Sequence, residues 1–191
     1  MSRPIPVEIV PSHVHLSEDD QVTLFGVAFA ATIAENLSQS GQYAYGETVD
    51  VSGRLKRQLS LRVLGPCRRE TQVEITPTEA QLLGCDAKEA KSGHHDVPGT
   101  CTVQGPEGSV TARVIVPQPH LHCSEVEAEQ LHVHNGKEVT IDLDLDRSCT
   151  LTNVVVRVHL TYRLRLHIHP DIAREYWLTG VVHGRIRESA L

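Results

Sequence analysis

Short hydrophobic runs alternate with polar turns along this chain, and most of the runs have the two-residue period of a β-strand. They are rich in β-branched residues, and Gly-Pro, Pro-Gly and Asn-Gly pairs separate several of them. This pattern predicts a mainly β protein. The expected strands are Val7–Val14, Glu47–Val51, Leu59–Leu64, Thr71–Ile75, Thr100–Val103, Val110–Val116, Glu138–Leu145, Val154–Leu160 and Arg163–His169.

Short helices are expected where a Ser or Thr is followed three residues later by an acidic residue. This capping pattern occurs at Ser17, Thr76 and Ser124. A fourth helix is expected near His169, because Pro170 suits the first helical position. Residues 88–97 are expected to form a loop.

Two histidine-rich phrases indicate an internal duplication. His13-Val-His15-Leu-Ser17-Glu18 resembles His120-Leu-His122-Cys-Ser124-Glu125, and Val73-Glu74-Ile75-Thr76-Pro77 corresponds to Leu166-His167-Ile168-His169-Pro170 further along each half. We therefore expect two small β-barrel domains related by duplication, with short capping helices. Their approximate extents are 1–90 and 91–191, with exchange of strands between the halves allowed.

Composition excludes several classes of protein. A net charge of -6 and 4% aromatic residues argue against a nucleic-acid partner. No apolar stretch approaches the roughly 20 residues of a membrane span, and no secretory signal is recognisable, so we expect no membrane partner. The odd number of cysteines, 5, predicts free thiols in a reducing compartment.

The duplicated His-x-His pairs are the strongest chemical signal. Residues i and i+2 of a strand share a face, so each pair presents two imidazoles together. A lone pair of this kind is more often one buried and one solvated histidine. Here each half adds a third ligand-type residue at a matching position, which predicts one metal site from His13, His15 and Glu74 and another from His120, His122 and His167. Three protein ligands leave a position for water or substrate, as in catalytic zinc sites.

The remaining histidines lack such support. His169 is interpreted as a helix-capping residue or as a neighbour of the metal ligands, and His132 and His134 as solvated. Cys67 and Cys123 have no basic partner fixed by the sequence, so a nucleophilic role is not favoured.

A turn at Gly65-Pro66-Cys67-Arg68-Arg69 carries two arginines just before the Glu74 strand. Guanidinium groups suit phosphate, and the nearby helix starts also favour anions. The residues themselves do not decide which arginine is functional, and a solvated turn is the plainer interpretation of the pair.

The chain resembles the phosphate propanoyltransferases of the propanediol-utilisation type, which are phosphotransacylases associated with bacterial microcompartments. The resemblance follows the family's order over nearly the whole chain. Its phrases are Ser12-His-Val-His-Leu-Ser17, Leu37-Ser-Gln-Ser-Gly-Gln42, Glu47-Thr-Val49, Arg62-Val-Leu-Gly-Pro66-Cys-Arg68, Thr71-Gln-Val-Glu-Ile75, Gly105-Pro-Glu-Gly-Ser109, His120-Leu-His122 and His167-Ile168.

The resemblance implies two duplicated β-barrels and a two-zinc site on the six ligands named above, with Arg68 contacting phosphate. It implies exchange of a propanoyl or acetyl group between coenzyme A and phosphate. It also implies a cytoplasmic location, alone or inside a microcompartment, and partners that include a second copy of the chain or microcompartment proteins. Pro119, Cys123 and His169 depart from the family pattern, which leaves the fit to the substrate open.

Two alternatives remain beside this reading. A cupin-like metal oxygenase or isomerase also uses His-x-His, Glu and His on a β-barrel, although there the Glu follows the His pair within a few residues. A non-catalytic metal-binding or shell-associated module is the other alternative.

Overall fold

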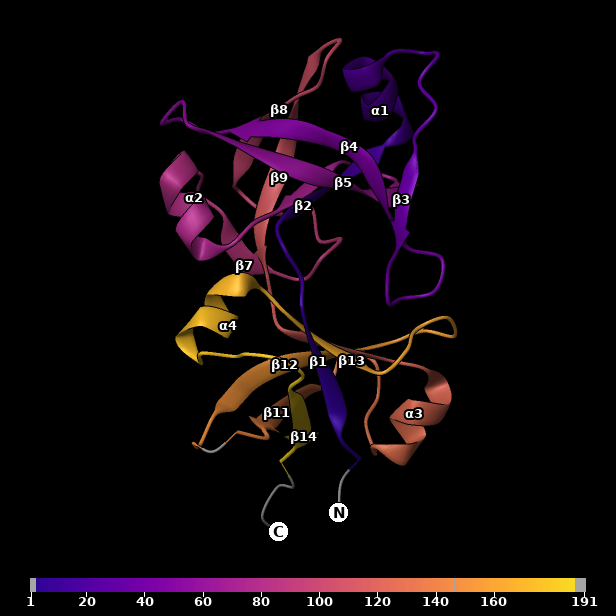
Figure 1. Cartoon of the computed structure of the whole chain (residues 1–191), viewed down its shortest axis with the longest axis vertical. Coiled ribbons are helices and arrows are strands. Elements are labelled where there is room, and N and C mark those ends of the chain that lie inside the picture. Colours follow the sequence, from indigo (N-terminus) through magenta and orange to yellow (C-terminus); the bar gives the residue numbers. More distant parts are fainter. Residues whose placement is uncertain (1–2, 146, 188–191) are drawn as a thin grey trace. The chain divides into compact units, whose positions relative to one another are not determined.

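The computed structural model describes residues 3–145 and 147–187, and it confirms a mainly β protein with short helices (Figure 1). In chain order the elements are β1 (Ile5–Ile9), β2 (His13–Ser17), α1 (Glu18–Phe25), β3 (Ile33–Asn36), β4 (Tyr43–Ser52), β5 (Gln58–Arg68), β6 (Gln72–Glu74), α2 (Pro77–Leu83), β7 (Lys88–Ala90), β8 (Thr100–Gln104), β9 (Ser109–Pro117), β10 (His120–Cys123), α3 (Glu125–Gln130), β11 (Glu138–Leu143), β12 (Thr150–Val158), β13 (Arg165–Ile168), α4 (Pro170–Glu175) and β14 (His183–Ile186).

The helices begin where the capping patterns predict. Ser17, Thr76 and Ser124 hold the N-cap positions of α1, α2 and α3, and each side chain accepts a hydrogen bond from the backbone N–H three residues later. In α2 and α3 the glutamate side chain at that third position accepts a hydrogen bond from the backbone N–H of the cap residue, which completes a capping box. Each cap satisfies a backbone N–H that the helix itself leaves without a partner.

The chain folds into two compact units. We call Pro11–Pro117 the central unit. The described parts of Met1–Val10 and Gln118–Leu191 form the terminal unit, named for the two terminal stretches of sequence from which it is built. In the terminal unit the strands close into a barrel in the order β1-β13-β10-β12-β11-β14. In the central unit the pairings run β4-β5-β2-β6-β9-β8 and return to β4, with β3 and β7 added at β4 and β9.

The same pairing pattern occurs in both units, as a duplication would produce. The His-x-His strand (β2 or β10) pairs parallel with β5 or β12 and antiparallel with β6 or β13. The strand preceding it, however, pairs in the other unit. β1 leads into β2 yet pairs with β13 and β14 (Figure 1). β9 leads into β10 yet pairs with β6 and β8.

This exchange makes the units differ from the halves 1–90 and 91–191 expected from the sequence. Residues 91–117 belong to the central unit and residues 3–10 to the terminal unit. The single strand expected at Val7–Val14 is also wrong, because it is two strands interrupted at residues 10–12. Pro11 lies in this break, where its missing N–H removes no ladder hydrogen bond.

Four further strands differ from expectation. Part of the loop expected at residues 88–97 is the short strand β7, and the expected strands do not include β3, β10 and β14. None of the helices among the described residues combines the length and hydropathy needed to cross a bilayer.

Candidate metal centres

The first cluster lies in the central unit and consists of His13 and His15 on β2 with Glu74 on β6. The two strands pair antiparallel, and His13 lies directly opposite Glu74. Val14 and Leu16 alternate with the histidines and belong to the hydrophobic core, so the histidines occupy the opposite face of β2. The three donor atoms lie within 4.8 Å of one another. Strand register therefore brings together the three residues that the sequence predicted.

A hydrogen bond decides which nitrogen of His13 is available. Its Nδ1 donates to the Pro11 carbonyl oxygen at 2.8 Å, which leaves Nε2 with the lone pair when the ring is neutral. This Nε2 lies 3.1 Å from Nε2 of His15 and 3.7 Å from Oε2 of Glu74. Nε2 of His15 lies 3.8 Å from Oε1 of Glu74. Two imidazole nitrogens and a carboxylate are a donor set that suits zinc or a similar divalent ion.

Burial and neighbouring charge set the protonation of this cluster. Burial raises the pKa of Glu74, but His13, His15, Arg68 and a hydrogen bond from Ser92 outweigh it and lower that pKa to about 2. Burial, followed by the charge of His13, lowers the pKa of His15 well below its usual value. An ionised carboxylate and a neutral imidazole are the forms that bind a metal.

Arg68, at the end of β5, contacts the same carboxylate. Its Nη1 donates to Ser92 Oγ at 3.0 Å and to Glu74 Oε1 at 3.4 Å. The Ser92 hydroxyl in turn donates to Glu74 Oε1. The structure thus places Arg68 beside the first cluster, and its contact with phosphate stays a prediction.

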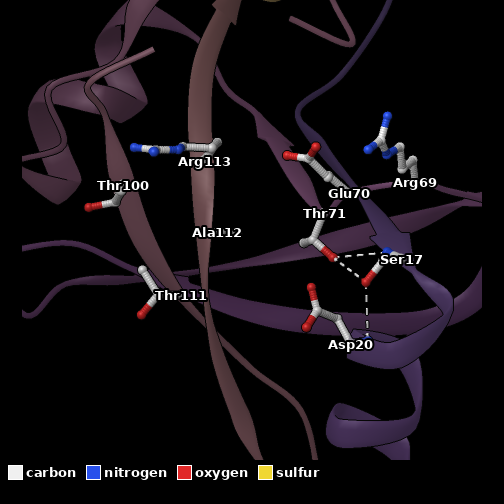
Figure 2. Close-up of a pocket in the computed structure, with 9 residues that line it drawn as sticks. All are labelled: Ser17, Asp20, Arg69, Glu70, Thr71, Thr100, Thr111, Ala112 and Arg113. Carbon is white, nitrogen blue, oxygen red and sulfur yellow. Dashed lines mark hydrogen bonds between the residues drawn. The ribbon is translucent and has the colours of Figure 1, made fainter. Parts of the chain in front are cut away.

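Its neighbour Arg69 lies elsewhere, in the lining of a polar pocket of about 440 Å³ in the central unit (Figure 2). Figure 2 shows Ser17 and Thr71 joined by hydrogen bonds at one side of this pocket, where the Ser17 N–H donates to Thr71 Oγ1 at 2.9 Å. None of the six predicted ligands is among its lining residues. These are Ser17, Asp20, Arg69, Glu70, Thr71, Thr100, Thr111, Ala112 and Arg113.

The second cluster lies in the terminal unit and repeats the geometry of the first. His120 and His122 lie on β10, and His120 is directly opposite His167 of β13. The ring centroids are 4.7 Å apart for His120 and His122, 5.2 Å for His120 and His167, and 4.7 Å for His122 and His167. Nδ1 of His120 donates to the Gln118 carbonyl oxygen at 2.8 Å, as Nδ1 of His13 does to Pro11.

His122 shows that this cluster fits a metal ion. The residue is 4% exposed, yet neither of its ring nitrogens has a hydrogen-bond partner within the described residues. Burial, followed by the charges of His120 and His167, lowers its pKa, so the ring is neutral and carries a lone pair. A buried imidazole without a partner is costly, and a bound divalent ion would satisfy it.

Glu8 lies next to this cluster and was not predicted from the sequence. It lies opposite His167 in the β1–β13 register, with its Oε2 3.4 Å from His167 Nε2. The position opposite Glu74 in the central unit is the apolar Ile115. Glu8 is separated from His167 by most of the chain, and only the exchange of β1 brings the two together. A lone acidic residue in an otherwise apolar strand was the one available signal.

The other histidines take no part in either cluster as far as the described residues show. His169 occupies the N-cap position of α4, as expected, but makes no side-chain capping hydrogen bond. The histidines outside the clusters are His94, His95, His132, His134, His159, His169 and His183.

The thiols are poor candidates for a nucleophile. All five cysteines are free, as predicted. Burial raises the pKa of Cys67, and it raises that of Cys123 to about 11, so both remain protonated near neutral pH.

Fold and clusters together define a duplicated β-barrel protein with one candidate metal centre in each unit. Residues 6–178 match the family described as phosphate propanoyltransferase. A phosphate propanoyltransferase of Rhodobacter capsulatus is 36% identical over 186 residues, which cover 96% of this chain and 86% of that protein. Proteins of the same name from Clostridioides difficile and Citrobacter koseri are 36% and 37% identical, over 88% and 90% of this chain and 82% of each relative. The chain belongs to the phosphate propanoyltransferase family, and it is an acyltransferase.

Proposed function

We propose that this chain exchanges a short acyl group, propanoyl or acetyl, between coenzyme A and phosphate. The observation that carries the proposal is the pair of matching buried clusters in a chain of this family. The names of the relatives supply the acyl group and the phosphate, and the clusters supply a place for the chemistry.

Two zinc ions would be held by the two clusters. His13, His15 and Glu74 would hold one ion, and His120, His122 and His167 the other. When bound there, the ions supply Lewis-acid polarisation of the thioester carbonyl and stabilise the thiolate that leaves. With three protein ligands, each centre keeps a position for a substrate atom.

Arg68 is the residue proposed to bind phosphate. Its guanidinium lies beside Glu74 and Ser92, so it is held at the first cluster by two partners. A guanidinium suits phosphate oxygens and stabilises negative charge as it develops. In the reaction a phosphate oxygen forms the new bond to the acyl carbon, the carbon–sulfur bond breaks, and the sulfur leaves with the electron pair as the coenzyme A thiolate. Holding phosphate against the thioester gains from proximity, and no protein nucleophile is needed.

The test combines metal analysis with a thiol-release assay on acetyl- and propanoyl-CoA, with and without phosphate. We expect about two zinc ions per chain and release that depends on phosphate. Metal without release would favour the non-catalytic module, and metal-dependent oxygen consumption would favour the cupin-like alternative. A second copy of the chain, microcompartment proteins and a cytoplasmic or microcompartment location stay predictions from the family resemblance.

A further inference from the structure

One buried side chain ties the loop after β7 to the strand that carries Glu74. Gln72 on β6 is 0% exposed. Its Oε1 accepts a hydrogen bond from the Gly93 N–H at 2.7 Å, and its Nε2 donates to the His94 carbonyl oxygen at 2.7 Å. Both ends of the carboxamide are therefore used on the backbone of this loop, as a buried amide requires.

These two hydrogen bonds, which we call the Gln72 latch, lie at the first cluster. Gln72 is directly opposite His15 in the β2–β6 register and shares a face with Glu74, two residues further on. The residue before Gly93 is Ser92, whose hydroxyl donates to Glu74 and accepts from Arg68. Ser92 is next to the Gly93 peptide that Gln72 holds. The position of this loop therefore sets the geometry of the hydrogen bond between Ser92 and the Glu74 carboxylate.

The barrel itself does not require such a latch. In the terminal unit the matching position, opposite His122, is Arg165. That side chain donates to the adjacent Leu164 carbonyl oxygen at 2.9 Å and pairs with Glu8 at 3.7 Å. The same strand pairings form around both residues. The hydrogen bonds of Gln72 are therefore not needed for strand pairing, and they serve a role in the central unit that the terminal unit lacks.

We propose that Gln72 is a positioning residue of the first metal centre. It holds residues 92–94 so that Ser92 and Arg68 orient the Glu74 carboxylate toward the metal and the phosphate. This proposal rests on the proposed function for its kinetic consequence, whereas its effect on the loop and on metal affinity does not depend on acyl transfer.

The test compares Gln72→Met with Gln104→Met. Gln104 is a matched control, because its Nε2 also holds a turn of the central unit, donating to the carbonyl oxygens of Gly105 at 2.8 Å and Gly108 at 3.0 Å. Three quantities are measured: exchange of the Gly93 amide hydrogen, zinc affinity of the first cluster in a His120→Ala background, and kcat and KM of the thiol-release reaction in the otherwise unaltered chain.

For Gln72→Met we expect Gly93 exchange at least about tenfold faster and zinc affinity about 10- to 100-fold weaker, as for other residues that orient metal ligands. The zinc-saturated variant should lose kcat while its KM for acyl-CoA stays near that of the unaltered chain. Gln104→Met should stay within about twofold on every measure. Gln72→Glu keeps the acceptor for the Gly93 N–H but loses the donor to His94, so it should protect Gly93 better than Gln72→Met.

Unchanged Gly93 exchange in Gln72→Met would overturn the latch. Faster exchange with zinc affinity and kcat equal to those of Gln104→Met would overturn its link to the metal centre. If the amides of β2 and β6 also lose protection in Gln72→Met, that substitution has disturbed the sheet. The Gln72→Glu variant is then judged by the same two criteria, its Gly93 exchange and its zinc affinity with kcat. Absence of phosphate-dependent release in the unaltered chain would overturn the proposed function instead, and Gly93 exchange with zinc affinity would still decide the role of Gln72.

Discussion

Replacing Glu74 with glutamine removes one negative charge from the first cluster and keeps the size of the side chain. In the folded, metal-free chain, burial raises the pKa of this carboxyl, but the surrounding His13, His15, Arg68 and Ser92 lower it from 4.5 to about 2. A carboxyl whose pKa is lower in the folded state stabilises the fold above its unfolded pKa. That stabilisation is lost as the pH falls from 4.5 toward 2.

The size of the effect follows from this difference. The difference between a pKa of 4.5 in the unfolded chain and one of about 2 in the folded chain corresponds to about 3 kcal/mol. Glutamine imitates the protonated carboxyl. We therefore expect Glu74→Gln to lower the free energy of unfolding by about 3 kcal/mol at pH 7 and by only about 1 kcal/mol at pH 3.

Urea unfolding of chelator-treated protein, followed by far-ultraviolet circular dichroism at both pH values, measures the two differences. Glu89→Gln is the matched control, because Glu89 is an exposed residue of β7 in the same unit. The control should change the free energy of unfolding by less than about 0.5 kcal/mol at either pH. A loss in Glu74→Gln that is as large at pH 3 as at pH 7 would refute the electrostatic reasoning, as would no loss at pH 7.

Three further predictions concern the proposed reaction. Arg68→Ala should lower kcat for thiol release by about 100-fold or more while both metals stay bound, and Arg69→Ala should match the unaltered chain; equal rates for the two variants would remove Arg68 from the mechanism. His13→Ala and His120→Ala should each lose about one of the two metal ions, because the clusters lie in separate units. Elemental analysis measures the metal content of each variant. Loss of both ions from either variant would contradict independent binding of the two ions. Cys123→Ala should retain thiol release, because the pKa of about 11 keeps that thiol protonated, and an inactive but folded variant would reverse this conclusion.

Local features account for what could be predicted about the fold. A Ser or Thr with an acidic residue three positions later is a self-contained signal, and the helices at Ser17, Thr76 and Ser124 begin as expected. Strand boundaries depended more on context. The run from Val7 to Val14 mixes apolar and polar residues around Pro11, and its division into β1 and β2 depends on which unit each part joins.

The clusters illustrate the same limit. The spacing of His13 and His15 is enough to place both rings on one face of a strand. Glu74 could be predicted only because His167 occupies the matching position of the repeat. Glu8 and Gln72 carry no such repeat signal, and their contacts to His167 and to Gly93 and His94 depend on strand exchange and on the path of a loop.

The sequence by itself determined the mainly β character, the duplication and the six candidate ligands, because alternation, caps and residue spacing act over a few positions. Only the tertiary structure decided that β1 and β9 pair outside their own halves, because pairing between distant strands depends on register and on competing partners. It also decided that Arg68 rather than Arg69 contacts Glu74, and that a buried glutamine holds the loop over that carboxylate. The paired histidines can therefore be predicted from the sequence, whereas the side chains that surround them depend on the tertiary structure.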